Sequence, residues 1–139
     1  MRQASRILSV DTPGRALVDV TRAVADWTAD QGMDEGLLTL FCRHTSASLL
    51  VQENADPAVR RDLMAWIERI APEDPGAYEH ADEGPDDMPA HLRAAVTAVQ
   101  LSIPVSAGRP VLGTWQAIYL FEHRRRPHRR EIALHLIGA

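Results

Sequence analysis

Three polar stretches of the sequence carry side chains of the kinds that do acid–base, metal and anion chemistry. Their candidate residues are His44, Thr45, Ser46, Glu53 and Asn54 in the first stretch, His80, Asp87 and His91 in the second, and Thr114, Gln116, Glu122, His123 and Arg124 in the third. Histidine transfers protons near neutral pH and is a common ligand of zinc. Hydroxyl and guanidinium groups bind phosphate and other anions. The chain therefore holds the parts of a small-molecule site in three separate places.

His44 follows an apolar stretch, residues 37–43, that is typical of a buried strand. Because side chains alternate along a strand, His44 would share a face with Leu38, Leu40 and Cys42. A histidine at the end of an apolar face is either a functional group in a partly dry cleft or a core residue with a hydrogen-bond partner. The segment by itself favours the core interpretation.

Three histidines, from a strand end, a loop and a helix, could converge on one metal ion. His44 ends the strand, His80 lies in an acidic loop, and His91 lies on the helix that follows this loop. At about 100° per residue, His91 falls just beside the apolar stripe of its helix, which predicts a position at the rim of the core. Three protein ligands with one open position are typical of catalytic zinc sites. No HExxH motif or CxxC pair supports this set, so spacing leaves the metal site as one alternative.

The third stretch reads GTWQAIYLFEHR and predicts a strand. Trp115, Tyr119 and Phe121 share one parity, which predicts a packed sheet face and a core position for Trp115. The residues that alternate with them and could face a cleft are Thr114, Gln116 and Glu122. Residues 124–130, which follow, are rich in arginine. Such a segment is most often a solvated turn, although it could also bind an anion or a nucleic acid.

The length, net charge and cysteine count of the chain exclude several classes of protein. The chain has 139 residues, a formal net charge of −4 and one cysteine, Cys42. This length predicts a single domain over residues 1–139, and the acidic total argues against a nucleic-acid partner. The sequence has no internal disulfide, no signal-peptide pattern and no apolar run near the roughly 20 residues of a membrane span, so we expect a cytoplasmic protein. Phosphate-binding loops, dinucleotide fingerprints and serine-hydrolase elbows do not occur.

Periodicity and turn residues predict where the secondary structure lies. Strands are expected at about residues 5–11, 15–20, 37–43, 48–52, 100–105, 111–122 and 130–137. Helices are expected at residues 21–31, at 57–70 with Asp56 as N-cap, and after a start at residues 86–89. The expected buried stripes are Val59, Leu63, Ile67 and Ile70 in the second helix, and Leu92, Ala95, Val96 and Val99 in the third.

The resulting order is roughly β-β-α-β-β-α-α-β-β-β. Because the strands are joined by short turns, we expect antiparallel pairing and an α+β sandwich with the helices packed on one face. Residues 124–130 would then form the hairpin tip between the last two strands.

Three segments together closely resemble the YjbQ family, often labelled secondary thiamine-phosphate synthase. They are HTSASLLVQENADPAVRRDL, YEHADEGPDDMPAHLRA and GTWQAIYLFEHR, and the resemblance runs from about residue 7 to the C-terminus. It implies an α+β sandwich with an antiparallel sheet, and a homotrimer with clefts close to subunit boundaries. The positions that match the family's recurrent polar residues are His44, Glu53, Asn54, Asp56, His80, Asp87, His91, Gly113, Thr114, Gln116, Glu122 and His123.

The activity that the resemblance implies joins a hydroxymethylpyrimidine diphosphate to a thiazole phosphate, as a weak or secondary reaction. We expect a divalent ion, zinc first, or magnesium with the diphosphate substrate, to help stabilise the leaving diphosphate. The expected roles are catalysis by His44, Glu53, Asn54, Asp87 and Glu122, substrate binding by Thr45, Ser46, Thr114, Gln116, His123 and Arg124, and metal ligation by His44, His80 and His91. A trimeric metal- or small-ligand-binding protein without turnover is the alternative, because it would need the same pocket.

The chain departs from the family's pattern just after His91. The family often shows Lys followed by Ser and a later Gly there, whereas this chain has Arg93 and Ala94. The change removes hydroxyl groups, so we assign no chemistry to residues 94–98. The Gly that often follows Trp-Gln is Ala117 here.

Overall fold

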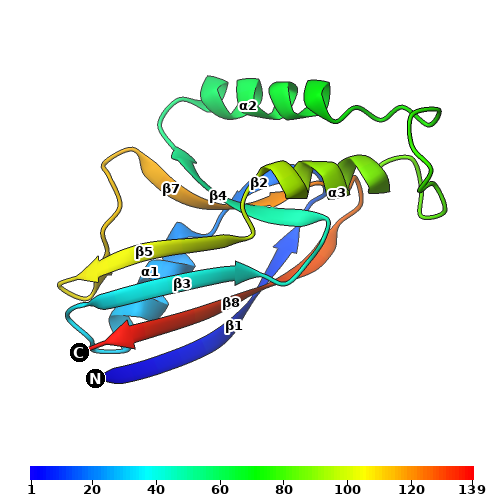
Figure 1. The fold of residues 1–139 in the computed structure, drawn as a ribbon. Coiled ribbons are helices and arrows are strands. Elements are labelled where there is room, and N and C mark those ends of the chain that lie inside the picture. Colours follow the sequence, from blue (N-terminus) through cyan, green and yellow to red (C-terminus); the bar gives the residue numbers. More distant parts are fainter.

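The computed structural model describes all residues 1–139, folded into two antiparallel sheets and three helices (Figure 1). The strands are β1 (Arg2–Thr12), β2 (Ala16–Asp19), β3 (Gly36–Cys42), β4 (Ala47–Glu53), β5 (Gln100–Ser106), β6 (Arg109–Pro110), β7 (Gln116–Glu122) and β8 (His128–Gly138). The helices are α1 (Thr21–Asp30), α2 (Pro57–Ile70) and α3 (Asp87–Val96). None of the three helices is long and apolar enough to cross a membrane.

One sheet has the strand order β1-β8-β3-β5-β6 and the other has the order β2-β7-β4. Every strand pair is antiparallel, so the predicted α+β class with antiparallel sheets is confirmed. β1 and β8 pair along their whole length, from Arg2 opposite Gly138 to Thr12 opposite His128. The two strands that flank residues 124–130 lie in different sheets, because β7 pairs with β2 and β4 whereas β8 pairs with β1 and β3. The predicted hairpin tip is therefore wrong, and this segment crosses from one sheet to the other.

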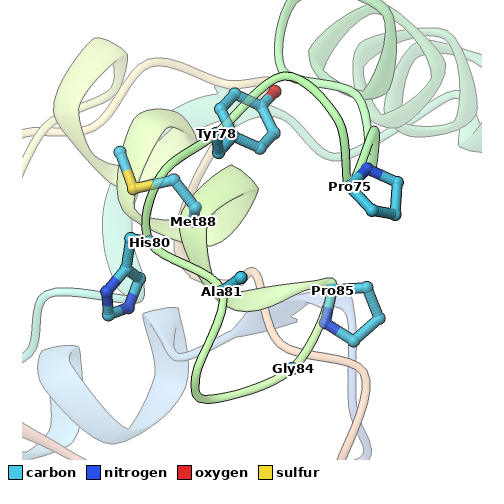
Figure 2. A pocket seen from close by; sticks show the side chains of 7 residues that line it. All are labelled: Pro75, Tyr78, His80, Ala81, Gly84, Pro85 and Met88. Atoms are coloured by element: carbon cyan, nitrogen blue, oxygen red, sulfur yellow. The ribbon is translucent and has the colours of Figure 1, made fainter.

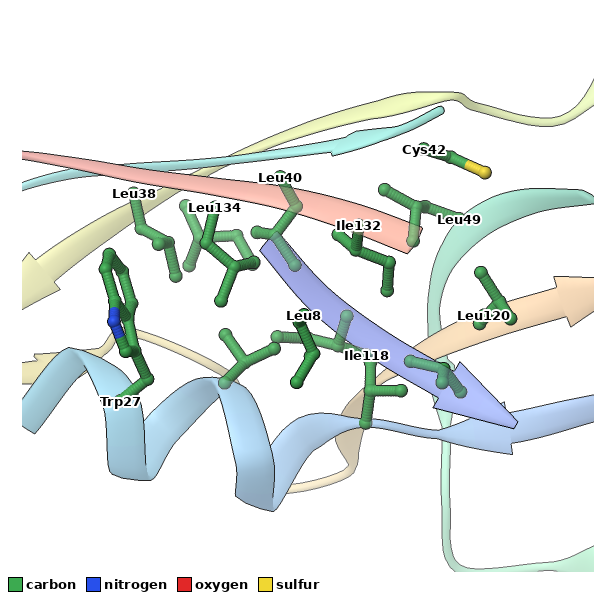
Figure 3. Close-up of a cluster of buried hydrophobic side chains, with 14 of the residues drawn as sticks. Leu8, Trp27, Leu38, Leu40, Cys42, Leu49, Ile118, Leu120, Ile132 and Leu134 are labelled. Carbon is green, nitrogen blue, oxygen red and sulfur yellow. The ribbon is translucent and has the colours of Figure 1, made fainter. Parts of the chain in front are cut away.

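The core fills the space between the two sheets (Figure 3). Its main side chains are Leu38, Leu40 and Cys42 from β3, Leu49 from β4, Ile118 and Leu120 from β7, Ile132 and Leu134 from β8, Leu8 from β1 and Trp27 from α1. These residues follow the period of two that a strand imposes, so the predicted inward face of β3 is confirmed. Burial raises the pKa of the Cys42 thiol, as expected for a cysteine that packs as a small hydrophobe.

The helices lie on two sides of the three-stranded sheet. α1 packs against β6 and β7 and places Val24 and Trp27 in the core. α2 and α3 lie together on the other side (Figure 1), where Nη1 of Arg60 on α2 donates to the Tyr119 hydroxyl of β7 at 3.4 Å. Both faces of β7 are therefore covered. The expected packing of the helices on one face holds for the five-stranded sheet, because α1 contributes to the core on its inner side and no helix covers its outer face.

The predicted buried stripes of α2 and α3 are largely wrong. In α2 only Ile67 is buried, while Trp66 and Ile70 are 48% and 46% exposed. In α3 the inward residues are Ala90, Arg93 and Ala94, and Val96 is 60% exposed. The small alanine side chains let α3 pack directly against β4, where Ala98 and Leu49 form a bridge just beyond the helix. The predicted start of α2 is confirmed, because the Asp56 carboxylate accepts from the Ala58 N–H at 2.9 Å.

The predicted strand 111–122 begins only at Gln116. The side-chain oxygen of Gln116 accepts from the Gly113 N–H at 2.7 Å, and the backbone N–H of Gln116 donates to the Gly113 carbonyl oxygen at 3.1 Å. These two bonds close a turn just before β7. Trp115 lies in this turn and is 62% exposed, so its predicted core position is wrong.

Candidate functional site

Two aspartates at the start of α3 are fixed by one arginine from the crossing segment. Asp86 occupies the N-cap position, but its side chain makes no capping bond. Its carboxylate instead accepts from Nε of Arg124 at 3.0 Å and from the N–H of Arg125 at 2.9 Å. Nη1 of Arg124 also donates to Oδ1 of Asp87 at 2.6 Å. The second carboxylate oxygen of Asp87 is thereby turned away from the arginine.

This second oxygen, Oδ2 of Asp87, contacts two histidines. It lies 2.7 Å from Nε2 of His80 and 3.1 Å from Nε2 of His91, and the two imidazole rings are 5.6 Å apart. The Glu83 carboxylate lies 3.9 Å from Nε2 of His80. Each of these four residues offers one ligand atom, and the four atoms lie within 4.8 Å of one another. We call His80, Glu83, Asp87 and His91 the histidine–carboxylate cluster.

The hydrogen bonds of His91 fix which ring nitrogen faces the cluster. Nδ1 lies 2.9 Å from the backbone carbonyl oxygen of Thr45, which can only accept, so Nδ1 carries the proton. In the neutral ring, Nε2 then presents a lone pair to the Asp87 carboxylate at 3.1 Å. Two acceptors at this distance repel each other unless a proton or a cation lies between them. A histidine held through Nδ1 by a backbone carbonyl is the usual arrangement of a metal ligand.

Asp87 is held in the charged form that a cation would need. Its side chain is 2% exposed, and burial alone would raise the pKa of the carboxyl group. The hydrogen bond from His80 and the charge of Arg124 help to outweigh burial, so the pKa of Asp87 lies below its usual value.

The cluster lies between two small pockets. One, of about 230 Å³, is bounded by the loop before α3 and by the start of that helix (Figure 2), and its lining residues are Pro75, Tyr78, His80, Ala81, Gly84, Pro85 and Met88. The other, of about 260 Å³, is lined by His44, Thr45, His91, Ala94, Ala95 and Val99. A ligand in either pocket would touch one histidine of the cluster.

His44 lies near the cluster but outside it. It shares the second pocket with His91, yet its Nε2 accepts from the Glu131 N–H at 2.7 Å. Burial lowers the pKa of His44, and the charge of Arg130 lowers it further. The structure thus brings together two of the three histidines expected to bind a metal, with Asp87 beside them. A metal role for His44 stays a prediction.

Glu122, one of the expected catalytic residues, lies fully buried at the end of β7. Its carboxylate accepts from Nε of Arg130 at 2.7 Å, from the Thr12 hydroxyl at 2.7 Å and from the Arg124 N–H at 3.1 Å. Arg130 also donates to the hydroxyl of Ser46 at 3.0 Å. Glu122 does not reach the surface of the chain, and its catalytic role stays a prediction.

His123, expected to bind substrate, is fully buried as well. Its Nε2 lies 2.9 Å from the Ser48 hydroxyl, and its ring packs against Phe121. Burial, reinforced by the positive charge of Arg93, lowers the pKa of His123 to about 3, so the ring is neutral at physiological pH. We interpret it as a polar member of the core.

The remaining expected residues lie at the opposite end of β4 and β7. Glu53 pairs with Gln116, whereas Ala47 and Glu122 pair at the end beside the cluster. The Asn54 N–H donates to the Trp115 carbonyl oxygen at 2.9 Å, and Thr114 is exposed next to it. Six strand residues span roughly 20 Å. One small ligand bound to a single chain therefore cannot contact both ends.

Sequence reasoning missed Glu83 as a cluster member and Arg130 as the partner of Glu122. The sequence did carry a signal for the cluster, because Asp87 and His91 are four residues apart on one helix and so share a face. Glu83 lies four residues before Asp87 and three after His80. No local signal pairs Arg130 with Glu122, because the two residues come from different sheets.

Comparison with known proteins gives one consistent family. The family model described as UPF0047 protein YjbQ-like matches residues 6–139. A UPF0047 protein of Synechocystis sp. is 47% identical over 137 residues, which cover 99% of this chain and 93% of that protein. The UPF0047 protein YjbQ of Escherichia coli is 41% identical and covers 96% of each chain.

Solved structures agree with these relatives. A YjbQ/UPF0047 family protein of Clostridium acetobutylicum, described as uncharacterized, has a TM-score of 0.86 and 30% identity, covering 95% of this chain and 99% of its own. A YbjQ-like protein of unknown function from Sulfolobus solfataricus, 22% identical, shares the fold with a TM-score of 0.87 over 99% of this chain and all of its own. The matched length and identity together show that the chain belongs to the YjbQ (UPF0047) family.

Proposed function

We propose that this protein is a divalent-metal-dependent transferase that acts on phosphorylated heterocycles, in the manner of a thiamine-phosphate synthase. The observation that carries the proposal is the 3.1 Å contact between Nε2 of His91 and Oδ2 of Asp87, because both atoms are acceptors when the ring is neutral with its proton on Nδ1. A cation between them would turn a repulsive contact into two bonds. The YjbQ resemblance supports the choice of substrates, a pyrimidine diphosphate and a thiazole phosphate.

The donor set fits zinc. His80, Asp87 and His91 would supply two nitrogens and one oxygen, with Glu83 as a further oxygen donor. Tetrahedral bonds of about 2.0 Å place ligand atoms roughly 3.3 Å apart, close to the 2.7 and 3.1 Å that separate the two histidines from Asp87. When bound, the ion would supply positive charge for the leaving diphosphate.

The chain's own residues would hold the two substrates. The pocket in Figure 2 offers the ring of Tyr78 and the side chains of Pro85 and Met88 beside His80, which suits a flat heterocycle. Thr45 is exposed and lines the neighbouring pocket, and its side chain carries a hydroxyl that can donate to a phosphate oxygen. In the reaction, a ring nitrogen bonds to the methylene carbon of the pyrimidine as the carbon–oxygen bond to diphosphate breaks.

The test measures metal content and pyrophosphate release together. We expect about one zinc or similar ion per chain by elemental analysis of tag-free protein purified without chelators. His80→Ala and His91→Ala should lose this ion, while Asp26→Ala, which removes an exposed carboxylate on α1 outside the cluster, should keep it. His44→Ala should also keep it if the cluster alone holds the ion, and it should lose it if the set expected from sequence is right.

Activity separates an enzyme from a binding protein. Pyrophosphate release from the two substrates should stop in His91→Ala and continue in Asp26→Ala. A metal-free, folded wild-type protein would contradict the metal proposal. Substrate binding by the metal-loaded protein without any pyrophosphate release would favour the alternative, a ligand-binding protein without turnover.

We also propose that the chain works as a homotrimer, as the resemblance implies. The outer face of the five-stranded sheet carries Ile7, Leu37, Phe41 and Ile137, each between 40% and 48% exposed. Ile7 and Phe41 flank Ala133, and Leu37 pairs with Ile137, so these side chains form an apolar surface across β1, β8 and β3. An apolar surface of this kind is typical of an interface.

Light scattering after gel filtration checks the assembly. The wild type should have three times the 15.4 kDa mass of the chain, and Phe41→Asp should have the mass of a monomer. Arg22→Glu, at an exposed position on α1, is the control and should stay trimeric. A monomeric wild type at micromolar concentration, or a trimeric Phe41→Asp, would contradict the use of this face.

A further inference from the structure

A third pocket, of about 250 Å³, is lined almost entirely by charged side chains. Its lining residues are Arg15, Glu68, Pro72, Glu73, Arg93 and Arg125. They come from the turn after β1, from α2 and the loop that follows it, from α3, and from the segment that crosses to β8. The pocket shares no residue with the two pockets beside the histidine–carboxylate cluster. We call it the arginine pocket.

Arg93 is the unusual member of this pocket. It is 1% exposed, and its guanidinium donates only to the backbone carbonyl oxygen of Ala71, from Nε at 3.2 Å and from Nη2 at 2.8 Å. Nη1 is buried and has no hydrogen-bond acceptor among the protein's atoms. A buried charge without a counter-charge is costly, and proteins normally pair it or use it. Arg93 also lines the pocket, so it adds its positive charge there and keeps one donor without a protein partner.

A carboxylate already lies between the other two arginines. One oxygen of Glu73 accepts from Nε of Arg125 at 3.0 Å and from Nη1 of Arg15 at 3.3 Å, and its other oxygen pairs with Nη2 of Arg125. Nη2 of Arg15 also donates to Glu68 at 2.6 Å. Glu73 belongs to the loop between α2 and α3, which has no regular secondary structure to hold it in place. Its carboxylate holds the two guanidinium groups in the arrangement that an anion would need.

We propose that the arginine pocket binds a phosphate group, with Arg15, Arg93 and Arg125 as donors and Glu73 as a carboxylate that the phosphate displaces. Phosphate suits the pocket better than a carboxylate does, because it carries up to two charges and three strong acceptor oxygens. Three guanidinium groups against two carboxylates leave the pocket with a net positive charge. The proposal goes beyond the metal-dependent reaction and does not depend on it.

The arginine pocket is connected to the cluster by two adjacent arginines. Arg125 lines the pocket, and its backbone N–H donates to Asp86 at 2.9 Å. Arg124 binds both Asp86 and Asp87. A phosphate held by Arg125 would therefore act on the segment that orients the cluster, either as part of a bound substrate or as a separate effector.

Calorimetric titration tests the pocket with inorganic phosphate and with phenyl phosphate as probes. The protein is first passed over a chelating resin, so that no bound metal contributes to phosphate binding. We expect one phosphate per chain. Arg15→Gln and Arg125→Gln should each weaken binding about 10-fold or more, because each removes a charge-assisted hydrogen bond. Glu73→Gln should tighten binding several-fold, because it removes the competing charge.

Two further variants test whether phosphate binds in the arginine pocket rather than elsewhere on the chain. Arg126→Gln removes an exposed neighbouring charge outside the pocket and should leave binding unchanged. His91→Ala disables the proposed metal site and should also leave binding unchanged. If Arg93→Met does not fold by circular dichroism, the Arg15 and Arg125 variants still decide the question.

Three results would overturn the proposal. They are no saturable binding in either wild type or Glu73→Gln, an equal loss of binding in Arg126→Gln, and loss of binding in His91→Ala. Tighter binding of phenyl phosphate than of inorganic phosphate would identify a phosphate ester as the ligand, and the reverse order would identify the free anion. Either order supports the pocket.

Discussion

Glu122→Ala is expected to destabilise the protein by about 3–5 kcal/mol, the usual cost of breaking a buried ion pair from one side. The carboxylate is fully buried, and Arg130, its main partner, is only 5% exposed. Without Glu122, Arg130 would keep a buried charge with no counter-ion, and the Thr12 hydroxyl would lose an acceptor. Urea unfolding followed by circular dichroism measures the difference in the free energy of unfolding.

Arg129→Ala is the matched control. Its partner Asp11 lies on the surface, and both side chains are more than 70% exposed, so the change should fall within about 1 kcal/mol. A Glu122→Ala variant as stable as Arg129→Ala would show that the buried pair contributes little.

The effect of Glu122→Ala should depend on pH. Burial would raise the pKa of Glu122, but hydrogen bonds from Arg130 and Thr12 outweigh burial and hold it below the usual 4.5. A carboxyl group whose pKa is lower in the folded state stabilises the fold above its unfolded pKa and loses this contribution as the pH falls through the folded pKa. The difference between wild type and variant should therefore be full above about pH 5 and shrink below it. A constant difference down to pH 3 would contradict the charge argument.

Asp87→Asn is expected to weaken zinc binding roughly 100-fold or more, because it removes the only charge that contacts both histidines. The amide has nearly the same shape, so the loss would report on charge rather than on packing. The bond from Arg124 would also weaken, which should cost about 1.5–3 kcal/mol of stability. Competition with a chromophoric chelator measures the affinity, and urea unfolding measures the stability.

Asp86→Asn separates the two effects. Asp86 binds the same arginine but contacts neither histidine. Its variant should lose similar stability and keep its zinc affinity within a few-fold. Equal losses of affinity in both variants would mean that Arg124, rather than direct ligation by Asp87, controls the metal site.

Local sequence patterns predicted the elements better than their arrangement. Asp56 and Pro57 mark a helix start through backbone chemistry that acts within three residues, and the alternation of Leu38, Leu40 and Cys42 reports one buried face. A short segment can join two neighbouring strands of one sheet or lead from one sheet into another, and which of these occurs depends on how the sheets pack. This is why residues 124–130 were expected at a hairpin tip and lie between the sheets instead.

For the candidate site, too, the sequence predicted individual residues better than their arrangement in space. His80, Asp87 and His91 could be named from sequence, and the four-residue spacing of the last two already places them on one helix face. Which histidine joins them depends on side-chain direction at a strand end, and His44 turns toward the backbone of Glu131. The burial of Arg93 could not be read from its helix, because the predicted aliphatic stripe points elsewhere.

The pairing of β1 with β8 sets the order in which the protein can fold during synthesis. β1 is synthesised well before its only neighbour in the sheet, which is residues 128–138. At about 5–20 residues per second, β1 waits on the order of 10 s with its hydrogen-bonding edge open and with Ile7 and Leu8 uncovered. Pairing between such distant segments is slow, and open strand edges attract other chains. β1 would therefore stay exposed on the growing chain until β8 has been made.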